Sequence, residues 1–463
     1  MSAPVPSGLE ALLGPGGLIT DPQEMAPYVT GWRYGQGRAR FVARPATTEA
    51  VAALLARCRA EGVRVVPQGA NTGLVGASVP DMGGEMAVLS LERLDRLEVD
   101  PADRTALAGG GVRLSALNAA LAPHGLFFPV DLGADPCVGG MVATNTGGTR
   151  LLRYGDVRRN LLGVEVVLAD GTVVDALSPL RKNNAGLDWK QLFTGTSGLF
   201  GVVTAASLQT APLPRQVSAA LVAVEDGAAA LALLLAAEAG LGETLSAFEA
   251  MSAEALAPVF RHLPNPFDLV PPYAVLVEAS TALPATAFDL EAALQGVLEA
   301  HLEAGGPGIL DARFGRAEAF WALRHRISES LREEGRVLAF DLSVPRSSLP
   351  AFTAEARARV AAAWPWLRVC DFGHWGDGGT HLNLVWREEA APGDPAGWIP
   401  EVQAGLYALA VEGFRGSYSA EHGVGPHNQR SFDRFTPAPV KAAGAALRAH
   451  FDPAGILGTA RLW

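Results

Sequence analysis

Two histidines flank an Asp-Gly pair in the stretch CDFGHWGDGGTHLNLVW, which covers residues 370–386. An Asp-Gly pair between extended segments is typical of a two-residue β-hairpin turn. With Asp377 and Gly378 in the turn, His374 faces His381 across the two strands. Directly opposed residues share one face, with Cβ atoms about 5 Å apart, and this spacing lets two imidazoles bind one cation. Two histidines beside a glycine turn can equally be structural, so the pair alone leaves both interpretations open.

A third group with ligand chemistry follows in SAEHGVG, residues 419–425. Glu421 offers a carboxylate ligand and His422 a base, and both can face one site only at a turn. Gly423 and Gly425 permit such a turn. Alone, a Glu-His pair is typical of a surface loop. Two histidines and one carboxylate, however, leave coordination positions open on a metal ion, as a catalytic metal requires.

A possible substrate anchor lies in FWALRHRISESLREEG, residues 320–335, which predicts an amphipathic helix. Arg324 and Ser328 are four residues apart and therefore share a helix face. A guanidinium held there can bind a substrate carboxylate in a bidentate pair. A solvated arginine is an equal alternative, because this helix carries several. Asn383 lies two residues past His381 and is expected on the same face of the hairpin.

Two glycine-rich loops, residues 65–80 and 136–155, have the composition of a phosphate cradle. Glycines let the backbone approach a ligand closely, and backbone N–H groups in such loops bind phosphate. Glycine-rich turns are more often structural, so each loop alone is weak evidence. A GxGxxG motif between a strand and a helix is absent, which disfavours a dinucleotide-binding Rossmann fold.

The helices and strands that must position these candidate site residues can be predicted from the pattern of apolar and turn-forming residues. Residues 62–67 predict a strand, Thr47–Glu61 a helix with a threonine N-cap, and 162–177 a hairpin. Two prolines in residues 211–216 indicate a boundary, and residues 217–370 alternate helices and strands as in an α+β domain.

The overall composition and charge limit which classes of protein and partner are compatible with this sequence. A chain of 463 residues with 49% hydrophobic residues is long enough for two or more buried cores. A net charge of −11 without a basic stripe argues against nucleic acid as a partner. The apolar run Ala228–Ala237 is too short to span a membrane and predicts a buried helix. Three scattered cysteines and an N-terminus without a secretion signal predict a cytoplasmic location.

Several motifs, taken in order, resemble the flavin-binding domain of the vanillyl-alcohol oxidase type of flavoenzyme. They are PQGANTGLVGASVP, DLGADPCVGGMVATNTGG, RYGDVRRNLLGVEVVLADGTV and KNNAGLDWKQLFTGTSGLFGV. GHxGDGxxHLN followed by SxEHGVG is similar to the D-2-hydroxyglutarate, D-lactate and glycolate dehydrogenase branch. The resemblance implies an α+β fold with a two-subdomain FAD-binding domain and a substrate (cap) domain built on an antiparallel sheet with helices. We expect domain limits of 1–212 for the FAD-binding domain, 213–425 for the substrate domain with the metal site, and 426–463 for a C-terminal segment returning to the FAD domain.

The resemblance implies FAD held non-covalently. Relatives that attach the flavin covalently use histidine or cysteine, and Cys137 is the one candidate in these loops, but its position matches a branch that binds FAD without a covalent bond. The positions that match the FAD-contacting segments are Pro67, Gly69, Ala70, Asn71, Thr72, Gly73, Leu74, Ser78, Val79, Asp131, Gly139, Gly140, Thr144, Asn145, Gly147, Gly148 and Val202.

The resemblance also assigns the remaining site residues. His374, His381 and Glu421 match metal ligands, with zinc as the expected ion and Mn²⁺ or Fe²⁺ as alternatives. His422 matches the catalytic base. Arg324, Ser328 and Asn383 match substrate-binding positions.

The implied activity is the FAD- and metal-dependent oxidation of a D-2-hydroxy acid to its 2-oxo acid. Family lysines are replaced by Ala339 and Asn428, which argues against a dicarboxylate and favours a monocarboxylic or larger apolar acid. Alternatives are a flavin oxidase or flavin-dependent transferase of the same fold, and a flavin-binding paralogue without activity. The expected partners are a small 2-hydroxy acid and an acceptor protein or quinone. No membrane span is expected, and a homodimer is one option for the oligomeric state.

Overall fold

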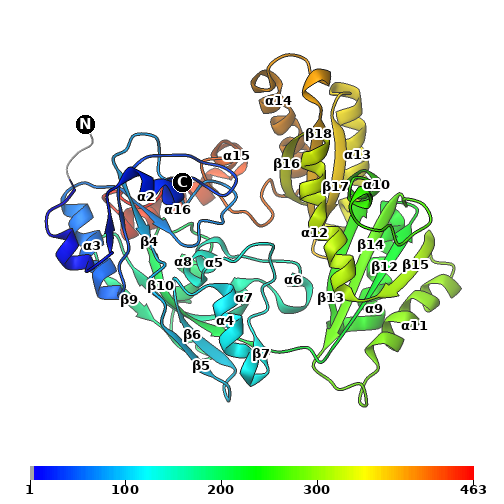
Figure 1. Ribbon diagram of the computed structural model, residues 1–463, viewed down its shortest axis with the longest axis horizontal. Coiled ribbons are helices and arrows are strands. Elements are labelled where there is room, and N and C mark those ends of the chain that lie inside the picture. The colour runs from blue at the N-terminus through cyan, green and yellow to red at the C-terminus, as the bar shows by residue number, and fades with distance from the viewer. Residues whose placement is uncertain (1–4) are drawn as a thin grey trace. The chain divides into compact units, whose positions relative to one another are not determined.

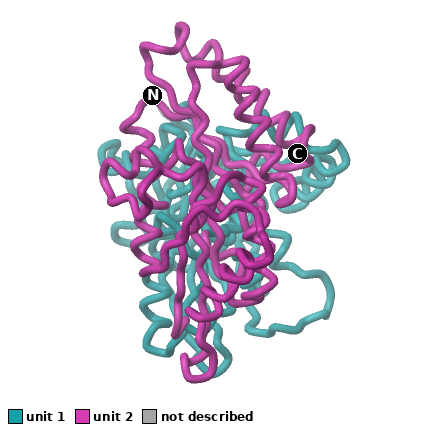
Figure 2. The backbone as a smooth tube through the Cα atoms, turned by 90° about the vertical axis from the view of Figure 1, so that its right-hand side faces the viewer, with its two compact units in different colours: residues 1–148, 155–213, 421–463 teal, residues 149–154, 214–420 magenta. Residues whose placement is uncertain are grey.

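The computed structural model describes residues 5–463, and the chain divides into two compact units. Unit 1 comprises the residues up to 148, residues 155–213 and residues 421–463; unit 2 comprises residues 149–154 and 214–420 (Figure 2). The predicted domain limits, 1–212, 213–425 and 426–463, stay predictions.

The first sheet of unit 1 has four strands. In spatial order they are β1 (Leu18–Ile19), β2 (Ala39–Ala43), β4 (Met86–Ser90) and β3 (Val65–Gln68). β2, β4 and β3 run parallel, and every residue of β4 is buried, as expected for a parallel strand covered on both faces. Helix α3 (Thr48–Ala60) packs its leucines into this core. The Thr47 hydroxyl accepts the amide of Ala50 at 3.1 Å, which confirms the predicted N-cap.

The second sheet of unit 1 is antiparallel. Its strands are β5 (Leu97–Asp100), β6 (Thr105–Gly109), β10 (Val202–Gln209), β8 (Leu161–Val167) and β9 (Val173–Ala176). β8 and β9 form the predicted hairpin, with Gly171 at φ +89° in its turn. Helices α4 (Leu114–Leu121) and α5 (Val138–Thr144) contribute to the same hydrophobic core as β6, β8 and β10.

The C-terminal segment completes unit 1. After α16 (Ala438–Phe451), the chain runs beside β3, where the Val65 amide donates to Ile456 O at 2.7 Å. The Gly458 amide returns a bond to Val65 O at 2.8 Å. Arg448 Nη1 donates to Leu199 O at 2.8 Å. The last residues therefore pair with a strand formed almost four hundred residues earlier in the chain.

Unit 2 is built on one antiparallel seven-stranded sheet (Figure 1). In spatial order its strands are β15 (Ile309–Gly315), β12 (Gln216–Val224), β14 (Tyr273–Thr281), β13 (Leu245–Ser252), β17 (Arg368–Gly373), β18 (Gly379–Trp386) and β16 (Arg336–Ser343). Together with the sheets of unit 1, it confirms the predicted α+β fold with an antiparallel sheet in the substrate domain.

Helices cover both faces of this sheet. On one face, α12 (Ala317–Glu334) and α10 (Ala253–Leu256) pack against alternate strand residues such as Leu221, Leu276 and Phe372. The intervening strand residues are also buried, so the opposite face is covered too, and α9 (Gly227–Leu241), α11 (Leu290–Glu303) and α13 (Leu349–Ala363) form that layer (Figure 1).

Helix α9 contains the apolar run noted in the sequence. Together with the turn that follows, Gly227–Thr244 is long and apolar enough to cross a membrane by length and composition. Its residues Leu233, Leu234 and Ala237 are buried against unit 2. The helix is therefore longer than the sequence predicted, and it packs one face into unit 2, with 39% of the window Gly227–Thr244 buried.

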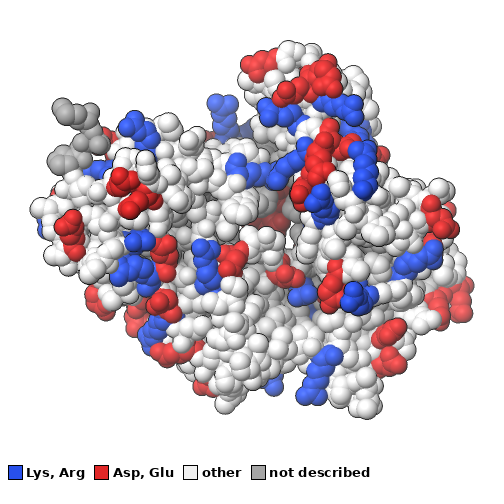
Figure 3. All heavy atoms as spheres, viewed as in Figure 1, with Lys and Arg blue, Asp and Glu red and all other residues white. Residues whose placement is uncertain are grey.

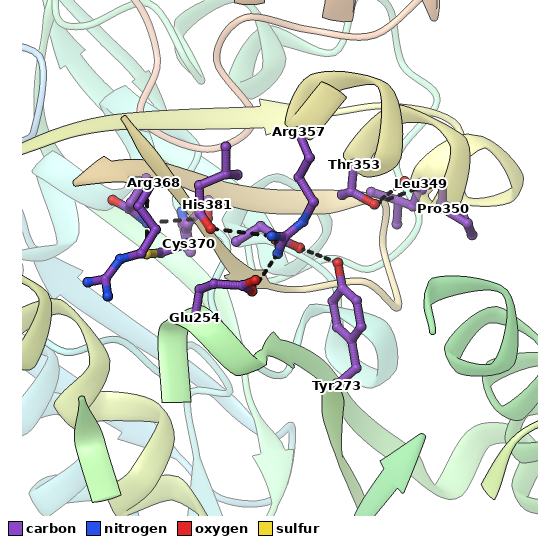
Figure 4. Close-up of polar contacts among 12 residues, drawn as sticks. Glu254, Tyr273, Leu349, Pro350, Thr353, Arg357, Arg368, Cys370 and His381 are labelled. Carbon is purple, nitrogen blue, oxygen red and sulfur yellow. Dashed lines mark hydrogen bonds and ion pairs between the residues drawn. The ribbon is translucent and has the colours of Figure 1, made fainter. Parts of the chain in front are cut away.

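A buried ion-pair network stabilises the sheet on its α13 face. Asp371 of β17 is fully buried, accepts the Tyr273 hydroxyl at 3.0 Å and pairs with Arg357 of α13. Figure 4 shows Arg357 lying between Glu254 and Tyr273, with Glu254 at 3.1 Å. Burial raises the pKa of Asp371, and Arg357 and Tyr273 oppose that rise. Burial and the neighbouring Asp371 charge also raise the pKa of Tyr273.

Exposed ion pairs contribute little to stability. The face in Figure 3 shows acidic and basic side chains interspersed, and exposed pairs such as Arg96 with Glu98 at 2.8 Å are each worth about 0–1 kcal/mol.

Replacing Asp371 by asparagine should lower the free energy of unfolding by about 3 kcal/mol, because Arg357 then loses its buried counter-charge. Urea denaturation monitored by tryptophan fluorescence measures this loss. The double variant Asp371→Leu/Arg357→Met removes both charges and should recover most of it. A single variant as stable as wild type would show that the pair contributes nothing.

Candidate functional site

The first glycine loop, residues 69–80, follows β3 and contains eight of the seventeen predicted FAD-contacting positions. Asn71 has a positive φ of 55°, and its amide group holds the loop by donating to Thr30 O at 2.8 Å and accepting Ser78 Oγ at 2.9 Å. Within residues 5–463, the backbone amides of residues 71–78 donate no hydrogen bond to protein. A run of unpaired amides fits a bound phosphate, so this loop, which includes Thr72, Gly73, Leu74 and Val79, suits the FAD pyrophosphate.

The second glycine loop surrounds α5. Gly139 packs so closely that a Cβ there would lie 2.9 Å from Val203 O. Asn145 ends the helix at φ 51°, and its side chain accepts the Arg158 amide at 2.9 Å. Gly148 has φ +136° and approaches Asp131, whose carbonyl oxygen would lie 2.5 Å from an added Cβ. The remaining predicted positions are Thr144 on α5, Gly147 shortly after it, and Val202 at the start of β10, much later in the chain.

The two loops meet at Gly69. A Cβ on Gly69 would lie 2.3 Å from Cys137 Sγ and 3.6 Å from Gly140 Cα. Pro67 is the neighbour of Gly198, whose Cβ would lie 3.2 Å from Pro67 Cγ. Cys137 is buried, which raises the pKa of its thiol and keeps it protonated. A buried neutral thiol is a poor nucleophile, which fits non-covalent cofactor binding.

The histidine hairpin of unit 2 differs from the predicted register. Phe372, not His374, pairs with His381, and residues 374–378 form the connection between β17 and β18. The prediction of a two-residue turn at Asp377-Gly378 is therefore wrong. The longer loop has a physical reason, because it buries Trp375, which is 1% exposed and packs on Tyr273 at a ring distance of 5.6 Å.

The two imidazoles nevertheless come together. The rings of His374 and His381 lie 5.2 Å apart, centroid to centroid, in an edge-on arrangement. Glu421 directly follows Ala420, the last residue of unit 2, whose amide donates to Asp341 O at 3.3 Å on β16. Ligand atoms of His374, His381 and Glu421 all lie within 4.8 Å of one another. Nitrogen and carboxylate donors in this number suit zinc and similar divalent ions.

Asp341 and the predicted base form a second group beside the first. Ligand atoms of Asp341, Glu421 and His422 also lie within 4.8 Å of one another. Asp341 pairs with His381 across β16 and β18, so the two side chains share a sheet face. The sequence reasoning did not include Asp341 in the site.

A further residue missed from the sequence is Glu249 on β13. It is 1% exposed, and its two oxygens bind His374 Nδ1 at 2.5 Å and Arg324 Nε at 2.6 Å. Burial alone would raise the pKa of Glu249, but His374 and Arg324 outweigh burial and lower it to about 2. The signal was present in the sequence, because a single acid inside the apolar strand LSAFEAMS requires a buried partner.

The predicted substrate residues differ in how deeply they are buried. Arg324 is 8% exposed on α12 and lies over the Phe372 ring at 4.6 Å. Asn383 is buried on β18, on the same sheet face as His381. Ser328 is exposed one turn after Arg324, so a shared helix face did not give the two residues the same environment.

The two positions that lack a family lysine have different surroundings. Ala339 on β16 pairs with Asn383, so it lies on the sheet face that carries His381. Asn428 instead shapes the turn after His422, because its amide donates to Gly423 O at 2.8 Å and accepts the Gly425 amide at 2.9 Å.

The fold and the loops together define a flavoprotein of the vanillyl-alcohol oxidase type. The "FAD binding domain" family matches residues 39–177, and "FAD linked oxidases, C-terminal domain" matches residues 213–461. The solved alkyldihydroxyacetonephosphate synthase superposes with a TM-score of 0.75 over 98% of this chain and 86% of its own, at 17% identity. The solved p-cresol methylhydroxylase superposes with a TM-score of 0.74 over 97% of this chain and 94% of its own, also at 17% identity. At this identity the likeness shows the fold alone.

Sequence relatives narrow the class further. The mitochondrial D-2-hydroxyglutarate dehydrogenase of Bos taurus is 38% identical over 96% of this chain and 80% of its own length. The enzyme of the same name from Rattus norvegicus is 36% identical over 96% of this chain and 82% of its own length. A D-2-hydroxyglutarate–pyruvate transhydrogenase of Saccharomyces cerevisiae is 32% identical over 94% and 89%. The chain belongs to this family of FAD-dependent D-2-hydroxy-acid dehydrogenases.

The prediction of a cytoplasmic location is wrong, because the two mammalian relatives are named as mitochondrial.

Gly69→Ala should weaken FAD binding about tenfold or more, equal to about 1.4 kcal/mol, because the new methyl group overlaps Cys137 Sγ and forces the two loops apart. The flavin-to-protein ratio during dilution or dialysis measures this. The double variant Gly69→Ala/Cys137→Ala should recover binding, since the next atom is 3.6 Å away. Unchanged FAD affinity in the single variant would contradict the placement of FAD in these loops.

Proposed function

We propose that this enzyme oxidises a D-2-hydroxy acid using non-covalent FAD and a divalent cation held by His374, His381 and Glu421. The observation that carries the cation assignment is the approach of two imidazoles and a carboxylate to within 4.8 Å. When bound, FAD supplies the hydride acceptor, and the cation supplies Lewis-acid polarisation of the substrate hydroxyl.

We assign proton transfer and substrate binding to residues of the chain. Neutral His422 accepts the proton of the C2 hydroxyl as a general base. Arg324 binds a substrate carboxylate through its terminal nitrogens, because Nε is already bonded to Glu249. Asn383 contributes a polar group on the sheet face that carries His381, and Ser328, although exposed, is kept as a proposed substrate-binding residue.

For the substrate, we favour a monocarboxylic or larger apolar D-2-hydroxy acid. Ala339 leaves the sheet face beside Asn383 without the cation that a second carboxylate requires. D-2-Hydroxyglutarate is the second candidate, because it is the acid named for the mammalian relatives. Anaerobic bleaching of the flavin by a panel of D-2-hydroxy acids separates the two and also separates an active enzyme from a flavin-binding paralogue.

For the electron acceptor, we propose a protein or quinone. A small 2-oxo acid is a second candidate, because the yeast relative is named a transhydrogenase with pyruvate. Hydrogen peroxide formed in stoichiometric amounts during turnover would instead identify an oxidase.

His422→Ala should reduce kcat by about 10²–10⁴-fold, the range typical for loss of a general base, while FAD stays bound. Stopped-flow flavin reduction measures the step directly, and the flavin spectrum controls for folding. Reduction at the wild-type rate would remove His422 from the base role.

Removal of the divalent ion by a chelator should abolish activity and leave the flavin spectrum unchanged, since the FAD loops and the ligand group use different residues. Added Zn²⁺ should restore turnover. Full activity in protein shown by elemental analysis to be metal-free would contradict the cation role.

A further inference from the structure

Glu249 is buried between two residues of the proposed site and contacts both. Its Oε1 lies 2.5 Å from His374 Nδ1, and its Oε2 lies 2.6 Å from Arg324 Nε. All three residues belong to unit 2: Glu249 on β13, His374 after β17 and Arg324 on α12. One carboxylate therefore joins a proposed cation ligand to the proposed substrate anchor.

The contact with His374 fixes which imidazole nitrogen can bind a cation. An ionised carboxylate only accepts hydrogen bonds, so the proton of neutral His374 must lie on Nδ1. The lone pair then lies on Nε2, so His374 would bind a cation through Nε2. Carboxylate partners of this kind orient metal-binding histidines and raise their basicity.

The contact with Arg324 fixes the direction of the guanidinium group. Nε is bonded to Glu249, and the group lies over the Phe372 ring at 4.6 Å. These two contacts define the guanidinium plane, and the terminal nitrogens make no other hydrogen bond within residues 5–463. The edge formed by those nitrogens is the one that binds a carboxylate in a bidentate pair.

We propose that Glu249 is a positioning residue that sets the His374 tautomer and the Arg324 orientation together, so that cation and substrate carboxylate are held in a fixed relation. This inference rests on the proposed function, because it assumes the roles given to His374 and Arg324. It predicts that the two roles of Glu249 can be separated by the choice of replacement.

Glutamine keeps the shape of Glu249 but cannot serve both partners. Its single oxygen can accept from Arg324 Nε, which always carries its proton. Its NH₂ group then faces His374 Nδ1 and must donate to it, which moves the histidine proton to Nε2. Glu249→Gln should therefore impair the cation site and preserve the arginine contact, whereas Glu249→Leu removes both contacts.

The experiment titrates Zn²⁺ into apo-metal, FAD-loaded full-length protein against a chromophoric chelator. Glu249→Gln should weaken zinc affinity about 10–100-fold, with wild-type FAD content. At saturating Zn²⁺ its KM for the best hydroxy acid of the panel should return close to the wild-type value. Glu249→Leu should show both weaker zinc binding and a raised KM that saturating Zn²⁺ does not correct.

Asp371→Asn is the matched control, because it also removes a buried carboxylate paired with an arginine, but on the opposite face of β17. It should keep wild-type zinc affinity. Unchanged zinc affinity in Glu249→Gln, or an equal loss in Asp371→Asn, would overturn the positioning role. A wild-type protein that binds no Zn²⁺ would instead overturn the cation assignment in the proposed function, which is a distinguishable result.

Discussion

A carboxylate buried inside a sheet must receive hydrogen bonds or a counter-charge, because an isolated buried charge is too costly to keep. Three of the buried acids of unit 2 illustrate this requirement. Glu249 is shared by His374 and Arg324, and Asp371 by Arg357 and Tyr273. The third, Glu278, accepts the Trp321 indole N–H at 2.7 Å, the Ser246 hydroxyl at 2.7 Å and Arg150 at 3.3 Å. These obligatory pairings hold α12, α13 and the short helix α6 (Leu151–Tyr154) on the sheet in one arrangement.

The order of the strands in the sheet explains why the residues of the proposed site come from distant parts of the chain. β13, β17 and β18 are neighbours in the sheet, although more than a hundred residues separate β13 from β17. Alternation places Glu249, Phe372 and His381 on the face that α12 covers. The helix carries Arg324 into the same layer, so one sheet face and one helix bring the proposed cation ligand His381 and the proposed carboxylate anchor Arg324 together.

Local patterns allowed much of this to be predicted. The Thr47 cap, the hairpin around Gly171 and the α+β class rest on neighbouring residues, and all three are confirmed. The pairing of His374 with His381 was predicted from turn chemistry and was wrong, since burial of Trp375 lengthens the loop. The apolar strand around Glu249 indicated a buried acid, but the partners of Glu249 and Asp341 could not be assigned from the sequence, because they are determined by strand order rather than by spacing along the chain.

The pairing of β3 with the C-terminal residues has a consequence for how the protein is made. Val65 bonds to Ile456 and Gly458, so β3 of the first sheet of unit 1 gains this partner only after residue 458 has been synthesised. Domains generally fold as units during synthesis from the N-terminus, and contacts that close long loops form slowly. On the ribosome, the seven-stranded unit 2 is complete in sequence by residue 420, before unit 1 has its final segment. The flavin-binding half, although it is begun first, is therefore expected to mature last.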